Sequence, residues 1–135
     1  MTFAKVPIAA TEAPTGRGPY PQAVQCGPFV FLSGQGPLSR VTNQPIAGSF
    51  ADQVTLTLDN VAAILAAARL GLEHVTKVTV YLSDLARVDE FNAIYSARMP
   101  KPWPARTLVQ CGLRGIDVEL DVIAVDPLGL RGVTP

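Results

Sequence analysis

The chain has 135 residues, of which 48% are hydrophobic and 16% are charged, and its 11 basic residues balance its 11 acidic ones. This length is typical of one domain, so we expect a single domain over residues 1–135. Zero net charge argues against nucleic-acid binding, which depends on clustered Lys and Arg. The low charged fraction predicts that part of the apolar surface is covered in an oligomer.

The cysteines, the single histidine and the apolar runs exclude further classes. Cys26 and Cys111 are too few for a disulfide framework, and neither they nor His74 form a cluster with metal-ligand spacing. The longest apolar run, residues 61–68, is shorter than the roughly 20 residues that span a bilayer, and the N-terminal residues lack a signal-peptide pattern. We therefore expect a cytoplasmic protein with free thiols, no metal and no membrane contact, whose two cysteines are small buried apolar residues.

The N-terminal third predicts an extended lead-in followed by a hairpin. Residues 12–21 hold three prolines and two glycines, which favour extended, turn-rich chain. Strands are predicted at 22–26 and 29–33, because Gly27-Pro28 between them is typical of a turn. Residues 34–48 contain further glycines and prolines and are expected to form a loop, with room for one short strand.

A long amphipathic helix is predicted over residues 49–70. Ser49 is a suitable N-cap, Asp52 lies in the first turn where the helix dipole favours an acid, and Gly71 is expected to end the helix. The apolar residues recur every three or four positions, as one face of a helix requires: Phe50, Val54, Leu58, Val61, Leu65 and Ala68.

The second half predicts alternating strands and a helix. Residues 75–82 alternate between apolar and polar side chains, which is typical of a half-buried strand. Asp84 is expected to cap a second helix with apolar positions at Leu85, Val88, Phe91 and Tyr95, and three alternating prolines at 100–104 end it. Two more strands are predicted at about 105–112 and 117–125, joined by a turn around Arg114-Gly115.

This order of elements contains two strand–helix–strand crossovers, which favours an α+β fold. We expect a mostly antiparallel, mixed sheet with both helices packed on one face. The last two strands each carry a set of apolar side chains on one face, and the helices can cover only one face of the sheet. The uncovered face is therefore predicted to lie at a subunit interface. These sets are Val109 with Cys111, and Val118 with Leu120 and Val122.

Arg106 is the first candidate for a binding residue. It opens a strand directly after a proline-rich segment, so its backbone is held before any ligand arrives. A guanidinium in such a place can bind a carboxylate through two parallel hydrogen bonds. The alternative, which the pattern alone favours, is an ordinary salt bridge on the surface or at an interface.

Six other residues, at four places in the chain, can contribute polar groups. Glu119 and Asp121 share one face of a strand and can act as general base and orienting acid, or can simply be solvated. Tyr20, between two prolines, can contact a ligand or wedge against the core. Ser33-Gly34 stands at the end of a strand and can present backbone N–H groups or a serine nucleophile, although phosphate binding has weak support without a Walker lysine. Asn92 is either a polar anchor on the second helix or exposed.

Six segments, in order over about residues 15–126, resemble those of a known family. They are Gly-Pro-Tyr-Pro-Gln-Ala-Val at 18–24, Phe-Leu-Ser-Gly-Gln at 31–35, Val-Thr-Val-Tyr-Leu-Ser-Asp at 78–84, Phe-Asn-Ala-Ile-Tyr at 91–95, Pro-Ala-Arg-Thr at 104–107 and Val-Glu-Leu-Asp-Val-Ile-Ala-Val at 118–125. On these segments the chain resembles the Rid/YjgF family, the reactive-intermediate (enamine/imine) deaminases.

The resemblance implies a chorismate-mutase-like α+β subunit in a homotrimer, with the helices outside and the sites in clefts between subunits. It implies neither a metal nor an organic cofactor. At the matching positions, Arg106 would hold the substrate carboxylate and the backbone at Ser33-Gly34 would add N–H donors. Tyr20 and Asn92 would line the cleft.

The implied reaction is hydrolysis of a 2-imino acid, formed from an enamine, to a 2-keto acid and ammonia, as in 2-iminobutanoate/2-iminopropanoate deaminases. The resemblance gives the water-positioning role to Asp121, where active members carry the longer glutamate. Leu108 is a second departure, because well-studied members often carry cysteine two positions after the arginine. These departures leave open compensation by Glu119 or a shifted strand, a different substrate, or weak activity.

Two other functions stay open at this point. A non-catalytic trimer that binds small carboxylate metabolites is favoured by the departures at Asp121 and Leu108. Ribonuclease activity, a label carried by some relatives, is disfavoured by the zero net charge and by the single histidine.

Overall fold

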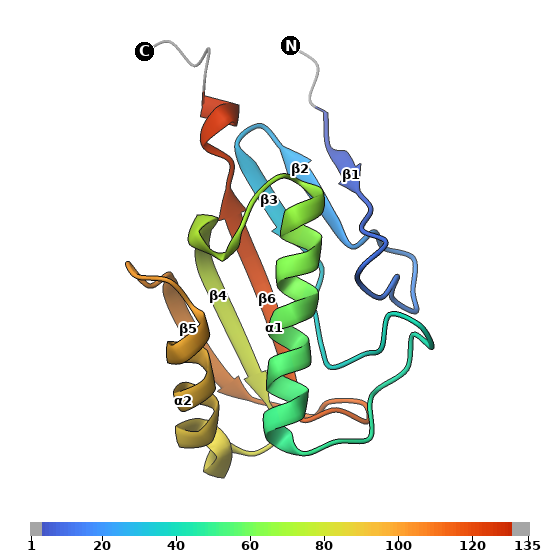
Figure 1. The fold of residues 1–135 in the computed structure, drawn as a ribbon, viewed down its shortest axis with the longest axis vertical. Helices are drawn as coiled ribbons and strands as arrows, with labels where there is room; N and C mark the ends of the chain where they lie inside the picture. Colours follow the sequence, from blue (N-terminus) through green and yellow to red (C-terminus); the bar gives the residue numbers. More distant parts are fainter. Residues whose placement is uncertain (1–3, 131–135) are drawn as a thin grey trace.

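The computed structural model describes residues 4–130, which form eight main elements (Figure 1). The elements are β1 (Val6–Ile8), β2 (Ala23–Cys26), β3 (Phe29–Leu32), α1 (Phe50–Ala67), β4 (Val75–Leu82), α2 (Val88–Arg98), β5 (Ala105–Gln110) and β6 (Val118–Val125). Short 3-10 helices occupy Leu72–His74, Leu85–Arg87 and Pro127–Leu130. The predicted hairpin, helices and later strands are confirmed with small shifts of their ends. Strand β1 was not predicted, because three residues including a proline carry almost no strand pattern.

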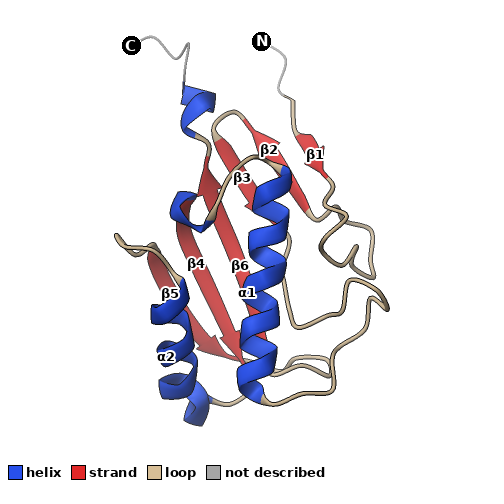
Figure 2. Ribbon diagram, viewed as in Figure 1, coloured by secondary structure: helices blue, strands red, loops and turns tan. Residues whose placement is uncertain are grey.

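The strands form one mixed six-stranded sheet in the order β1-β2-β3-β6-β4-β5. All neighbours are antiparallel except β4 and β5, which are parallel and joined through α2. Both helices pack on the same face of the sheet (Figure 2). The α+β prediction is therefore confirmed. Although β5 and β6 are consecutive in sequence, β4 lies between them, so β6 is a central strand and β5 is an edge.

The core lies between the helices and one face of the sheet. Val118, Leu120 and Val122 are buried there, together with the inward residues of β4. The opposite face is open in the single chain, where Phe31 and Val109 are each 40% exposed. The β6 residues thus need no second subunit to cover them, whereas the open face still carries large apolar side chains. A second copy on that face remains a prediction.

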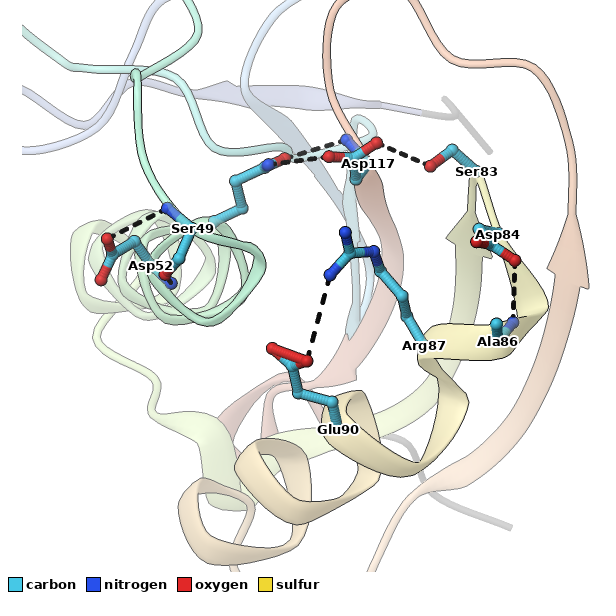
Figure 3. Close-up of polar contacts among 9 residues, drawn as sticks. Ser49, Asp52, Ser83, Asp84, Ala86, Arg87, Glu90 and Asp117 are labelled. Carbon is cyan, nitrogen blue, oxygen red and sulfur yellow. Dashed lines mark hydrogen bonds and ion pairs between the residues drawn. The ribbon is translucent and has the colours of Figure 1, made fainter.

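Helix α1 begins as predicted and ends earlier than predicted. The Ser49 hydroxyl accepts a hydrogen bond from the Asp52 N–H at 3.1 Å, and the Asp52 carboxylate accepts one from the Ser49 N–H at 3.2 Å (Figure 3). The prediction that Gly71 ends the helix is wrong, because the helix stops at Ala67 and Arg69 adopts the left-handed conformation with φ of 62°. That turn brings Leu70 into the core.

Asp117 joins the ends of three elements. One carboxylate oxygen accepts from the Ser83 hydroxyl at 2.7 Å, after β4, and the other accepts from the buried Gln53 amide of α1 at 2.9 Å. The Asp117 N–H donates back to Gln53 at 2.9 Å. Figure 3 shows Asp117 between the start of α1 and Ser83. These hydrogen bonds lower the pKa of Asp117, because they stabilise its charged form.

The described residues contain no helix that is both long and apolar enough to cross a bilayer. Within the same residues, no group of three His, Cys, Asp or Glu side chains is placed to hold a metal ion. Cys26 and Cys111 are free thiols, and both are half-buried rather than fully buried as predicted.

Candidate functional site

Two cavities hold most of the predicted site residues. The first, which we call the Arg106 cavity, has a volume of about 530 Å³ and lies between α2 and the start of β5. The second, the Glu119 cavity, has a volume of about 620 Å³ and lies between the segment after β1, the loop after β3 and the segment that enters β6. Both volumes fall in the range usual for small-molecule sites, about 300–1,000 Å³.

Arg106 lies against aromatic rings rather than against an acid. Its guanidinium carbon is 5.0 Å from the centre of the Tyr95 ring and 5.7 Å from that of Phe91, both on α2. No carboxylate among residues 4–130 lies within 4.0 Å of this guanidinium. The salt-bridge alternative is therefore not observed within the described chain. A stacked guanidinium keeps its N–H groups free to bind a carboxylate in a fixed orientation.

Two buried polar atoms lie beside Arg106 and have no hydrogen-bond partner in the described chain. They are Asn92 Oδ1 and the Tyr95 hydroxyl, and both residues line the Arg106 cavity. Burial raises the pKa of Tyr95, and the nearby Arg106 charge partly offsets that rise. Buried polar groups are seldom left unpaired, so these atoms are available to a ligand or an ordered water. Asn92, on α2, therefore lines the same cavity as Arg106.

Glu119 is the acid of the second cavity. It is half-buried, and burial raises its pKa, with the neighbouring Asp121 charge raising it further. Gly34 borders the same carboxylate, since a Cβ built on this glycine would stand 2.9 Å from Glu119 Oε2. Asp121, by contrast, is exposed and lies outside both cavities. The two acids predicted to act as a pair therefore have different surroundings.

The loop after β3 offers one free N–H group at this place. The Ser33 N–H donates to the Gln22 carbonyl at 3.0 Å, and the Gln35 N–H donates to the Leu120 carbonyl at 2.8 Å. Gly34 lies between them, and its N–H has no partner among the described residues. The Ser33 hydroxyl donates to the Pro21 carbonyl at 2.7 Å, so it holds the loop in place. That bond does not suit the alternative role of nucleophile.

Tyr20 lines the Glu119 cavity rather than the core. Its ring lies against the backbone of Gly16 and Gly18, where an added Cβ would stand 2.7 and 2.6 Å from ring atoms. Tyr20 is 50% exposed, which excludes the core-wedge alternative in the single chain. Its hydroxyl oxygen accepts a long hydrogen bond from the Arg17 N–H at 3.4 Å.

The register of the sheet puts Arg106 and the acids on opposite faces. Arg106 pairs with Val78, which is buried beneath the helices, so its side chain lies on the helix-covered face. Glu119 pairs with Tyr81 and Asp121 with Thr79, all on the open face. Leu108 shares the face of Arg106 and packs against the core, so it lines neither cavity. One chain alone therefore does not bring Arg106 and Glu119 to the same small ligand.

Two buried amides that sequence reasoning missed organise the cavity walls. The Gln22 side chain donates to the carbonyls of Ala10, Ala13 and Pro14 at 2.9–3.2 Å and accepts from the Ala10 N–H at 2.6 Å. The Asn60 amide of α1 donates to the carbonyls of Gly36 and Leu38, both at 3.0 Å. A signal existed for Asn60, since it lies on the apolar face of a helix where a polar side chain needs a partner.

Comparisons with known proteins agree with this fold. The family model described as Endoribonuclease L-PSP matches residues 10–126. Protein DfrA of Myxococcus xanthus is 39% identical over 127 residues, covering 91% of this chain and 97% of DfrA. The crystal structure of yeast Mmf1 matches with a TM-score of 0.86 and 33% identity, covering 91% of this chain and 99% of Mmf1. The crystal structure of E. coli TdcF with bound serine matches with a TM-score of 0.80 and 34% identity, covering 88% and 97%.

Proposed function

Because the chain belongs to the endoribonuclease L-PSP family, also called the Rid/YjgF family, we propose that it hydrolyses small 2-imino acids to 2-keto acids and ammonia. The observation that carries this proposal is the environment of two residues, Arg106 and Glu119, which lie in separate cavities of the chain. One is a guanidinium stacked on aromatic rings with no acid beside it in the described chain, and the other is a half-buried carboxylate whose pKa is raised. The first suits a substrate carboxylate and the second suits a general base.

In this proposal Arg106 binds the carboxylate of the imino acid, and Glu119 rather than Asp121 positions the water. Glu119 accepts a proton as the water oxygen bonds to the C=N carbon, and the proton passes to nitrogen. The hydroxyl proton of the tetrahedral intermediate then passes to the same nitrogen as the C–N bond breaks, so ammonia leaves and the C=O bond of the keto acid forms. The N–H of Gly34 and the hydroxyl of Tyr20 are the remaining polar contacts. Orientation of water, carboxylate and C=N provides much of the rate increase.

A second copy of the chain is part of the same proposal. Since Arg106 and Glu119 lie on opposite faces of one sheet, the complete site needs Arg106 from one copy and Glu119 from its neighbour. The exposed Phe31 and Val109 on the open face give such a neighbour an apolar contact. A homotrimer is the assembly that the family resemblance implies. E. coli TdcF, a structural neighbour, was crystallised with bound serine, which supports a small carboxylate ligand here as well.

The direct test generates an imine in solution and measures its lifetime. A threonine dehydratase or an amino-acid oxidase supplies the imine, and a carbonyl-reactive amine traps whatever has not been hydrolysed. We expect the purified protein to lower the trapped fraction, with no added metal or cofactor, and Arg106→Ala to have no such effect. An unchanged trapped fraction with the wild-type protein contradicts the proposal. Tight binding of 2-oxobutanoate without turnover selects the alternative, a non-catalytic binder of small carboxylates.

A further inference from the structure

Two arginines line the Glu119 cavity, and the proposed mechanism uses neither of them. Arg17 lies in the segment after β1, and Arg114 lies in the segment between β5 and β6. No carboxylate of residues 4–130 lies within 4.0 Å of either guanidinium. The charged groups that line this cavity are thus two guanidiniums and the single carboxylate of Glu119.

Arg17 is held in place by neutral partners. Its Nη1 donates to the Gln44 amide oxygen at 3.2 Å. The segment that carries it is fixed by Asn43, whose amide donates to the Gly16 carbonyl at 2.6 Å and accepts from the Gly16 N–H at 3.2 Å. These contacts position the guanidinium without neutralising its charge.

Arg114 lies in a bend between β5 and β6 and lines the same cavity as Arg17. Gly115 follows it with φ of 73°, a conformation that favours glycine. A Cβ on Gly115 would stand 4.0 Å from Pro45, next to the Gln44 that contacts Arg17. The two arginines therefore come from segments that pack against the same stretch of chain, residues 43–45, although they are far apart in sequence.

The two arginines of the Glu119 cavity suit a carboxylate on the side chain of the substrate. Guanidinium groups bind carboxylates in a planar, bidentate fashion. In the Glu119 cavity the two positive charges of Arg17 and Arg114 outnumber the one carboxylate of Glu119. If the substrate's main carboxylate is bound by Arg106 of a neighbouring copy, the groups of the Glu119 cavity face the rest of the molecule. A cavity of about 620 Å³ has room for a side chain that ends in a second carboxylate.

We propose that Arg17 and Arg114 form a subsite for a second carboxylate, so that this chain acts preferentially on imines of dicarboxylic amino acids. This inference rests on the proposed deaminase function and names its substrate class. It assigns Arg17 and Arg114 to substrate selection, leaving the chemical step to Arg106 and Glu119.

The kinetic test compares two classes of imine made in solution by amino-acid oxidases. The dicarboxylic class comes from aspartate and glutamate, and the neutral class from alanine and 2-aminobutyrate. We expect kcat/KM to be about tenfold or more higher for the dicarboxylic class. The double variant Arg17→Gln/Arg114→Gln is expected to lose this preference and to keep its kcat/KM on neutral imines within about twofold. Arg69→Gln, an exposed arginine that lines neither cavity, is the matched control and is expected to keep the preference.

A binding measurement separates this inference from the proposed function. Calorimetry compares 2-oxoglutarate with 2-oxobutanoate, for the wild-type protein and the double variant. Tighter binding of 2-oxoglutarate, lost in the double variant, supports the subsite even if no imine is hydrolysed, in which case only the deaminase proposal fails. Hydrolysis of all imines with no preference for the dicarboxylic class overturns the subsite and leaves the deaminase proposal standing.

The mass of the assembly in solution completes the experiment. If the double variant is monomeric while the wild-type protein is oligomeric, Arg17 and Arg114 stabilise the contact between copies. That result overturns the subsite. If the double variant keeps the wild-type mass and binds both keto acids as the wild type does, the subsite is equally overturned. An unchanged mass with a selective loss of 2-oxoglutarate binding supports it.

Discussion

Glu119 and Gly34 are packed so closely that a methyl group on the glycine would stand 2.9 Å from Glu119 Oε2 and 3.0 Å from its Cδ. The glycine therefore leaves the space that the carboxylate occupies, and its own N–H has no partner among the described residues. Glu119 comes from a central strand and Gly34 from the loop after β3, next to the hydrogen bonds that join Gln35 to Leu120 at 2.8 Å. The position of the Glu119 carboxylate therefore depends on the absence of a side chain at residue 34.

The first prediction concerns Gly34→Ala. The new methyl group displaces the Glu119 carboxylate by a few tenths of an ångström or more, while the backbone needs no change because Gly34 has an ordinary φ. Since a shift of about 1 Å in a catalytic group costs on the order of a hundredfold in rate, we expect roughly a tenfold loss of kcat/KM with nearly unchanged stability. Gly112→Ala is the control, because it adds a methyl group in the same cavity with nothing within 4 Å. Equal effects of the two variants would contradict this reading.

The second prediction concerns the substrate carboxylate and Arg106. Removing two charged hydrogen bonds at about 1.5–3 kcal/mol each lowers kcat/KM of Arg106→Ala by at least about a hundredfold. Arg106→Lys keeps the charge but loses the stacked, bidentate geometry, so it is expected to recover only a small part. Circular dichroism and the mass in solution should match the wild type, because the exposed side chain contributes little to the core. Wild-type activity in Arg106→Ala would exclude Arg106 from the site.

The third prediction follows from the raised pKa of Glu119. Its ordinary value is 4.5, and burial together with the Asp121 charge raises the pKa in the folded chain. A carboxyl group whose pKa is raised in the folded chain contributes its full stabilisation at pH values below its unfolded pKa, and that contribution is lost as the pH rises through the folded pKa. Glu119→Gln removes the free-energy cost of a charged, half-buried carboxylate at neutral pH. We therefore expect a higher Tm at pH 7 and a smaller gain near pH 4, with imine hydrolysis abolished. A Tm gain that is the same at both pH values would contradict the assignment.

The third prediction has a second measurement, the acid limb of the pH–activity profile. Activity requires ionised Glu119, so kcat/KM falls as the pH drops through its raised pKa. Asp121→Asn removes the neighbouring charge, which lowers the pKa of Glu119 and moves the acid limb to lower pH. Asp121 lines neither cavity, so this variant is expected to stay active at neutral pH. Loss of all activity in Asp121→Asn would instead return the water-positioning role to Asp121.

The fourth prediction concerns stability rather than catalysis. Asp117→Ala removes the partners of Ser83 and of the buried Gln53, and we expect it to cost about 2–3 kcal/mol of unfolding free energy at pH 7. Because its pKa is lowered, the contribution of Asp117 is present above its unfolded pKa and is lost as the pH falls through the folded value. Urea unfolding at several pH values measures this. Asp84→Ala, which removes only an exposed cap on Ala86, is the control and should cost about 1 kcal/mol or less.

The fifth prediction concerns the second copy. Phe31→Glu places a charge on the open face without touching the helix-covered core. We expect the mass in solution to fall to that of one chain, and imine hydrolysis to fall with it, while the circular dichroism spectrum is kept. Thr76→Glu, at an exposed position at the start of β4, is the control and should leave mass and activity unchanged. Full activity in a single-chain form would contradict a site shared between copies.

Much of the fold is a local property and was readable from the sequence. The apolar spacing of α1, the cap at Ser49 and the alternation in β4 each depend on residues within one element, so they predicted the elements closely. The end of α1 was misplaced because the burial of Leu70, a tertiary contact, selected Arg69 rather than Gly71 for the turn.

The sequence alone determined the family, the α+β class and the candidate residues, since these depend on residue types and on their order along the chain. Only the tertiary structure decided which acid faces a cavity and which side of the sheet each candidate residue occupies. Glu119 and Asp121 look equivalent on one strand, and their difference comes from the loop at Gly34 that packs beside one of them. Arg106 and Glu119 are separated by strand register, which is fixed by long-range hydrogen bonds that no short stretch of sequence encodes.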